Sequence, residues 1–155
     1  ADTSGKVFSL DMESGASGWE THIGRIADDA WSLAAGEDMI IAPAINEEMV
    51  AKSAEQQQNT RLVALRAADG SVAWKFDVQE GAKLVNALVS IRAGSCVFSD
   101  NKGNIYRLDL KTGEKIWNSK KMAAVPVQTV GAAIIDPSGE KVYATWNEAG
   151  WEVNH

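Results

Sequence analysis

The sequence predicts an all-β fold, a β-propeller of four-stranded antiparallel blades. Three observations predict it: a segment that recurs three times at matched spacing, strand-like residues before each copy, and a tight-turn signal inside each copy. Of the 155 residues, 45% are hydrophobic and 23% charged, as in an ordinary folded domain. We therefore treat residues 1–155 as a single partial propeller domain.

The recurring segment has a glycine five residues after a leucine and a tryptophan four residues after that glycine. The three copies contain Gly15 and Trp19, Gly70 and Trp74, and Gly113 and Trp117. Recurrence of one supersecondary unit along a chain indicates a repeat architecture. We interpret all three tryptophans as packing between neighbouring blades, because a structural role explains why every copy has one.

Each copy opens with a predicted strand rich in β-branched and aromatic residues, at 6–10, 61–65 and 104–108. A Ser, Asp or Thr and then the glycine follow in a tight turn, because glycine tolerates positive φ. A second strand, carrying the tryptophan, returns beside the first. The indole then has a fixed face on which to bury its large area.

Three further strand pairs are expected between these hairpins. They are 30–35 with 38–45, 88–92 with 96–99, and 130–135 with 141–146. Their turns are expected at Gly36 and Glu37, at Ala93 and Gly94, and at Asp136, Pro137, Ser138 and Gly139. Each unit is then four antiparallel strands, A to D, in about 43 to 55 residues, which is typical of a propeller blade.

This plan divides the chain into four parts. They are strands C and D of a first blade at 4–24, a full blade at 25–79, a full blade at 80–120, and strands A and B of a last blade at 125–150. The sum is about three blade equivalents, fewer than the 4 to 8 blades typical of a closed ring. Two interpretations remain open: a second copy completes the ring in a homodimer of six blades, or the other blades belong to a longer propeller.

The repeat also resembles a known one. Its pattern is (Val/Ile)-(Phe/Tyr)-x-Leu-Asp-x-x-(Ser/Thr)-Gly-x-x-x-Trp, where x is any residue. This pattern resembles the repeat of the pyrroloquinoline-quinone-like β-propellers, a WD-like repeat. That group includes quinoprotein alcohol dehydrogenases and an outer-membrane assembly lipoprotein. The third copy, 104–117, matches best, whereas the second has Arg66 in place of Asp and the first has Gly18 within a strand.

The resemblance implies a quinone site in the dehydrogenases, between a tryptophan and a disulfide of two adjacent cysteines, beside calcium. This chain has one cysteine, Cys96, and cannot form that disulfide, so we predict no cofactor for it. His22 and His155 have no Cys or further His at ligand spacing, so we predict no metal site. No hydrolase, phosphate-loop or dinucleotide motif occurs, and we predict no catalytic residue.

One segment exceeds what a blade needs. About 15 residues, roughly 46–60, are inserted between strands B and C of the second unit, with Asn46 as a candidate N-cap of a short helix. The insert is either a tolerated surface excursion or a protrusion that binds a partner. In the second case the contacts to test are Glu47, Met49, Val50, Gln56, Gln57 and Gln58.

Charge and hydropathy limit the partners. A formal net charge of −6 argues against nucleic acid, and no apolar stretch approaches the ~20 residues of a membrane helix. We predict a non-catalytic scaffold for protein partners or for a second copy, a subunit of a larger assembly. The alternatives are a fragment of a quinoprotein oxidoreductase and a small-ligand sensor at the propeller axis. The resemblance implies export to a periplasm or organelle lumen, with the cytoplasm left open.

Overall fold

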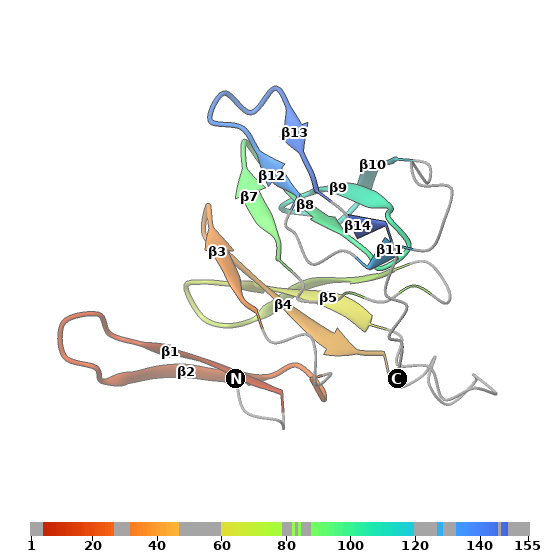
Figure 1. The fold of residues 1–155 in the computed structure, drawn as a ribbon. Coiled ribbons are helices and arrows are strands. Elements are labelled where there is room, and N and C mark those ends of the chain that lie inside the picture. The colour runs from red at the N-terminus through yellow and green to blue at the C-terminus, as the bar shows by residue number, and fades with distance from the viewer. Residues whose placement is uncertain are drawn as a thin grey trace, which may run out of the picture.

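The structure, a computed structural model, describes residues 5–26, 32–46, 60–78, 82, 84, 88–119, 127–128, 133–145 and 147–148. All regular secondary structure in these ranges is β-strand. Two four-stranded antiparallel sheets form the centre of the molecule (Figure 1). In both sheets neighbouring strands follow one another along the chain, which is the order of a propeller blade.

The first full blade consists of β3 (Ala34–Gly36), β4 (Met39–Ile45), β5 (Thr60–Arg66) and β6 (Val72–Asp77). The second blade consists of β7 (Ser90–Arg92), β8 (Ser95–Ser99), β9 (Ile105–Asp109) and β10 (Lys115–Asn118). They are referred to below as the first and second full blades. The strands β3 and β7, each at one edge of its sheet, contact each other.

Two hairpins flank the full blades (Figure 1). One is β1 (Lys6–Leu10) with β2 (Ser17–His22), and the other is β12 (Ile134–Ile135) with β13 (Val142–Tyr143). A short pair that the sequence pattern does not predict joins β11 (Val127–Gln128) to β14 (Asn147–Glu148). The predicted fold class, a partial β-propeller of four-stranded antiparallel blades, is confirmed.

Several strands are shorter than predicted, and one turn lies one residue later. β3 ends at Gly36, and the turn is formed by Glu37 and Asp38, both at positive φ (48° and 64°). Gly36 stays in the strand because Ile91 of the second full blade packs on it: an added Cβ would lie 3.2 Å from Ile91 Cγ2. The predicted positions 30–31, 130–132 and 146 lie outside the described residues.

The hydrophobic core lies between blades rather than within one. The largest buried cluster joins Ile41 and Leu62 of the first full blade to Phe98 and Leu108 of the second. A second cluster joins the β1–β2 hairpin to the first full blade, and a third joins the second full blade to the β12–β13 hairpin. The same face-to-face packing therefore occurs three times.

The hairpins that precede each repeat tryptophan share one turn. The N–H of Gly15 donates to Asp11 O, that of Gly70 to Arg66 O and that of Gly113 to Asp109 O, each at 2.9 Å. All three hairpins also have a register shift in their strand pairing, which is the mark of a β-bulge. The turn and the bulge together give each tryptophan the same position relative to its glycine.

Aspartates stabilise these turns. Asp109 Oδ1 accepts from the N–H of Thr112 at 2.8 Å, from its hydroxyl at 3.1 Å and from the N–H of Lys111 at 3.0 Å. These bonds, the Thr112 N–H foremost, hold the pKa of Asp109 below its ordinary value. In the second repeat, where Arg66 replaces this aspartate, Asp69 accepts from the N–H of Ser71 at 2.9 Å instead.

Asp109→Asn is expected to weaken the pH dependence of stability. The depressed pKa means that the carboxylate stabilises the fold at neutral pH and that this contribution disappears as the pH falls below about 4. Urea unfolding at pH 7 and at pH 3 measures the difference. Glu114→Gln, which removes an exposed charge from the same turn, is the control and should keep the wild-type pH dependence. An unchanged pH dependence in Asp109→Asn would contradict the prediction.

Candidate functional site

Two repeat tryptophans bind the turn of the following blade. The indole Nε1–H of Trp19 donates to the Ala67 carbonyl at 2.9 Å, and that of Trp74 donates to the Leu110 carbonyl at 2.9 Å. In both cases the acceptor lies three residues before the turn glycine of the next repeat. We call this contact, made by an indole, a carbonyl and a turn glycine, the tryptophan clasp.

The turn glycine also provides the space that the indole occupies. A Cβ added to Gly70 would lie 2.4 Å from Trp19 Cε3, and one added to Gly113 would lie 2.5 Å from Trp74 Cδ2. Both glycines have positive φ, 70° and 73°, so they supply a turn conformation and an open face together. Thr21 strengthens the first clasp by donating its hydroxyl to the Gly70 carbonyl at 2.7 Å.

Among the described residues, neither Trp117, the last repeat tryptophan, nor Gly15, the first turn glycine, takes part in a tryptophan clasp. The indole of Trp117, which is half-buried in β10, makes no hydrogen bond to another described residue. No described atom lies within 4 Å of a Cβ added to Gly15. In the described part of the chain, the Trp117 indole therefore has no partner turn and the Gly15 turn has no partner indole.

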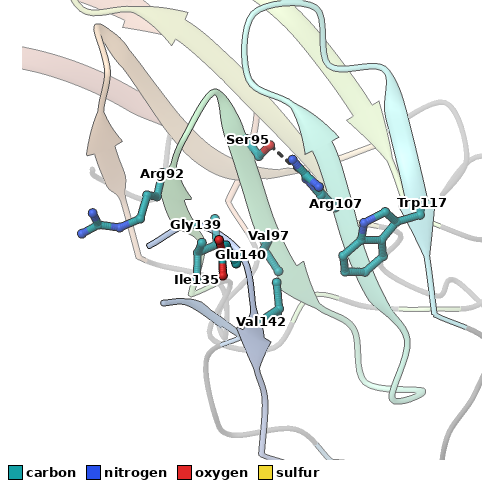
Figure 2. Close-up of a pocket in the computed structure, with 9 residues that line it drawn as sticks. All are labelled: Arg92, Ser95, Val97, Arg107, Trp117, Ile135, Gly139, Glu140 and Val142. Atoms are coloured by element: carbon teal, nitrogen blue, oxygen red, sulfur yellow. Dashed lines mark hydrogen bonds between the residues drawn. The ribbon is translucent and has the colours of Figure 1, made fainter. Parts of the chain in front are cut away.

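A pocket of about 140 Å³ lies beside Trp117, between the second full blade and the β12–β13 hairpin (Figure 2). Its lining residues are Arg92, Ser95, Val97, Arg107, Trp117, Ile135, Gly139, Glu140 and Val142. The Nε–H of Arg107 donates to Ser95 Oγ at 3.0 Å, and Nη1 of Arg92 donates to the Pro137 carbonyl at 3.3 Å. The walls combine an indole and aliphatic side chains with two guanidinium groups.

The thiol of Cys96 lies in the core between the two full blades. Burial raises its pKa to about 12, so the thiol stays protonated at neutral pH. A quinone site of the kind implied by the repeat needs two adjacent cysteines, and the chain has one. The residues of this chain therefore do not fit that cofactor.

The described part of the chain brings no metal-ligating cluster together. It contains no group of three or more His, Cys, Asp or Glu that could hold a metal ion. His22 is exposed, and its Nδ1 accepts from the Gly24 N–H at 3.3 Å. His155 lies outside the described residues.

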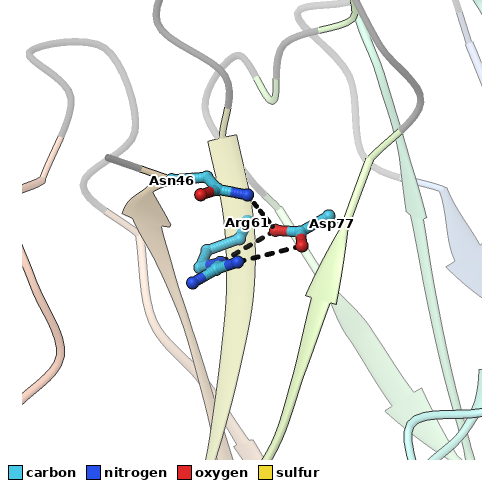
Figure 3. Close-up of polar contacts among 3 residues, drawn as sticks. All are labelled: Asn46, Arg61 and Asp77. Carbon is cyan, nitrogen blue, oxygen red and sulfur yellow. Dashed lines mark hydrogen bonds and ion pairs between the residues drawn. The ribbon is translucent and has the colours of Figure 1, made fainter. Parts of the chain in front are cut away.

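A polar cluster anchors the start of the insert (Figure 3). Arg61 binds Asp77 through two bonds, Nε to Oδ1 at 2.8 Å and Nη2 to Oδ2 at 2.9 Å. The buried side chain of Asn46 donates its amide to Asp77 Oδ1 at 2.9 Å. At the other end of the insert, the buried hydroxyl of Thr60 accepts from the Leu84 N–H at 2.9 Å.

The insert between these anchors, residues 47–59, lies outside the described residues. The same holds for the expected helix and for the six candidate contacts at Glu47, Met49, Val50, Gln56, Gln57 and Gln58. Thr60, which the sequence pattern places in the insert, is the first residue of β5. The anchoring cluster is a feature that reading the sequence missed.

A second polar network is also absent from the sequence analysis. The carboxylate of Asp100 is fully buried and accepts from the Lys102 N–H at 2.9 Å and the Asn104 N–H at 3.0 Å. It also accepts from the Asn104 side-chain amide at 2.7 Å and from the Tyr106 hydroxyl at 2.8 Å. This network fixes the loop between β8 and β9.

Residues 1–117 match the family model described as outer membrane protein assembly factor BamB. No match is found among curated proteins. The described residues include no helix suited to crossing a bilayer.

Solved structures that are similar to the chain include the following three. The crystal structure of BamB from Moraxella catarrhalis matches with a TM-score of 0.55 and 13% identity, over 95% of this chain and 44% of that one. A europium-containing methanol dehydrogenase matches with a TM-score of 0.56 and 15% identity, over 75% of this chain and 20% of that one. Quinohemoprotein alcohol dehydrogenase ADHIIG from Pseudomonas putida HK5 matches with a TM-score of 0.56 and 11% identity, over 94% and 28%.

At these identities the likeness shows the fold, and the fold is that of a propeller. The chain spans less than half the length of each of these three proteins.

Proposed function

The chain belongs to the BamB-like family of pyrroloquinoline-quinone-like repeat propellers, and from this premise we propose that it is a non-catalytic scaffold that holds protein partners in an assembly. The observation that carries the proposal is the use of the repeat tryptophans. Trp19 and Trp74 both serve as clasps between blades. These contacts hold neighbouring blades together as a rigid scaffold, and binding loops are usually carried by rigid scaffolds.

The name of the family model supports an exported protein that acts with outer-membrane proteins. In this proposal the partner is a protein of the outer-membrane assembly apparatus, and the chain works outside the cytoplasm. The net charge of −6 agrees with a protein partner rather than a nucleic acid.

We place the partner contact on the insert, residues 47–59. Its two ends leave the first full blade from Asn46 and Thr60, and both of these side chains are buried and hydrogen-bonded. A loop whose ends are fixed in this way loses less conformational entropy on binding than one with free ends. The contacts proposed are Glu47, Met49, Val50, Gln56, Gln57 and Gln58.

Site-specific photocrosslinking in cells tests this proposal. A photoreactive residue at Met49 or at Gln57 is expected to capture a component of the outer-membrane assembly apparatus, identified by mass spectrometry. The same residue at Lys111, exposed in the turn of the second full blade, is the control and is expected to capture none. Equal capture from all three positions, or none from any of them, would refute the placement of the contact on the insert.

A second candidate function is that the chain is part of a quinoprotein oxidoreductase whose cofactor-bearing blades lie outside these residues. The similarity to two dehydrogenase structures favours it. Incubation with pyrroloquinoline quinone and calcium, followed by gel filtration, separates the two candidates when it is done on a longer protein that contains these residues together with further blades. Quinone absorbance that elutes with that protein would support the oxidoreductase, and its elution apart from the protein would support the scaffold.

A further inference from the structure

We propose that Asp77 is a positioning residue for the partner contact: its carboxylate holds the two ends of the insert in place, and capture of a partner by the insert depends on it. This inference rests on the proposed function, because it names the residue that presents the insert to its partner. Asp77 is the last residue of β6 and lies outside the insert. Three observations carry the inference.

The first observation is that one carboxylate binds residues at both ends of the insert (Figure 3). Asn46, the residue before the insert, donates its side-chain amide to Asp77 Oδ1 at 2.9 Å. Arg61, the second residue after the insert, donates Nε to Oδ1 at 2.8 Å and Nη2 to Oδ2 at 2.9 Å. β4 and β5 already pair at this end, where Ile45 lies opposite Thr60. Asp77 therefore ties the same end to a third strand. We call Asn46, Arg61 and Asp77 the anchoring cluster.

The second observation is that the direction of these bonds is fixed. The Arg61 guanidinium and the Asp77 carboxylate meet as planar groups through two bonds, which holds both side chains in one orientation. Asn46 is 2% exposed, so its amide needs a partner within the protein. The Asp77 side chain is 44% exposed, so the ion pair is partly screened and contributes modestly to overall stability. The anchoring cluster therefore acts on position more than on stability.

The third observation is a comparison with the second full blade. There the same end is closed by Asp100, which follows β8 as Asn46 follows β4. Asp100 accepts from the Asn104 N–H at 3.0 Å and from its side-chain amide at 2.7 Å, across residues 101–103. The closing carboxylate of that blade thus belongs to the loop that it closes. In the first full blade it stands on β6, so the insert does not have to supply it.

The geometry of the anchoring cluster does not depend on how many blades the propeller has. The first full blade packs against the β1–β2 hairpin on one face and against the second full blade on the other. The cluster lies within this blade, at the end opposite to the Gly70 turn. The β-bulge between Ala64 and Leu65 sets its register, because it brings Asp77 opposite Arg61.

Loss of the Asp77 charge is expected to let this end of the first full blade open locally. An ion pair with this degree of exposure changes a local equilibrium about fivefold. A binding loop whose ends move must be ordered when its partner binds, and the cost of this ordering lowers the affinity. The proposal therefore has two steps, fixation of the ends and capture of the partner, and each step has its own measurement.

Hydrogen exchange of the purified protein, without a partner, tests the first step. In Asp77→Asn the amide exchange rates of Ile45 and Leu84 are expected to rise about fivefold. These amides report the two ends of the insert, because their N–H groups are hydrogen-bonded beside the anchoring cluster. The Ile41 amide, in the middle of β4, is the internal control and is expected to keep its wild-type rate. Unchanged rates at Ile45 and Leu84 would refute the role of Asp77.

Photocrosslinking in cells tests the second step. With the photoreactive residue at Met49, Asp77→Asn is expected to reduce capture of the outer-membrane assembly component about fivefold relative to the wild-type chain. Gly94→Ala, which strains a turn of the second full blade, is the control for a general loss of stability and is expected to keep wild-type capture. Capture that falls equally in both variants, or in neither, would overturn the proposal.

A charge exchange separates positioning from stability. Arg61→Asp and Asp77→Arg each place like charges on opposite residues of β5 and β6, whereas the double variant restores an opposite pair. Asn46 keeps a partner in the double variant, because an amide accepts through its oxygen as well as donating through its nitrogen. Capture is expected to fall in both single variants and to recover in the double variant. Recovery of the Ile45 exchange rate without recovery of capture would contradict the proposal.

The proposed function and this inference fail in different ways. A wild-type chain that captures no component from Met49 refutes the proposed function. Wild-type capture in Asp77→Asn refutes the positioning role of Asp77 and leaves the proposed function intact.

Discussion

Replacing Gly113 by alanine is expected to lower the free energy of unfolding by about 3 kcal/mol. Two effects combine in this expectation. A non-glycine residue at a φ of 73° is strained by about 1 kcal/mol, and the new Cβ lies 2.5 Å from Cδ2 of the buried Trp74 ring. Because that ring is held between two blades, it can move away only by opening their interface. Urea unfolding followed by tryptophan fluorescence measures the change.

Gly94→Ala is the matched control for this prediction. Gly94 has a φ of 68°, close to that of Gly113, but no described atom lies within 4 Å of its added Cβ. It therefore reports backbone strain alone, with an expected loss of about 1 kcal/mol. Equal losses in the two variants would show that the turn glycines matter only for backbone conformation. The overlap between a Cβ at Gly113 and the Trp74 ring would then contribute nothing to the loss.

Asp100→Ala is expected to lower the free energy of unfolding by about 4 kcal/mol. The substitution removes the acceptor of four hydrogen bonds and leaves the Tyr106 hydroxyl and the Asn104 amide buried without that partner. Buried donors without acceptors are destabilising by about 1–3 kcal/mol each, with partial relief where water enters. Thermal or urea unfolding measures the loss.

Tyr106→Phe tests the same network from the donor side. It removes one hydrogen bond and leaves the Asp100 carboxylate with its other donors, so the expected loss is about 1 kcal/mol. The ring stack of residue 106 on Phe98, at a centroid distance of 5.0 Å, is kept in this variant. A loss as large as that of Asp100→Ala would mean that the hydroxyl alone holds the loop.

Reading the sequence predicts the hairpins well because the signals for a hairpin are local. The turn glycine, its polar neighbour and the alternating strand residues stand within about ten positions. The partners of the tryptophans are not local. Trp19 binds a carbonyl 48 residues away and Trp74 one 36 residues away, so spacing predicts that each indole is buried but not which atom accepts its N–H.

The Arg61 and Asp77 pair shows a second limit. Counting outward from the turn places Arg61 opposite Phe76, but the register shift between Ala64 and Leu65 moves the pairing by one residue, to Asp77. A β-bulge leaves no clear mark in a single sequence, so a salt bridge that depends on one is missed. The turn after β3 was misplaced for a similar reason, because the residue that packs on Gly36 belongs to another blade.

The tryptophan clasp also gives the repeat a direction. In both clasps the indole of one unit donates to the unit that follows, and the acceptor is the carbonyl three residues before the turn glycine of that following unit. Duplication or loss of one whole unit in a gene therefore leaves every junction with the same chemistry. A family built in this way can change its number of blades during evolution without inventing a new contact.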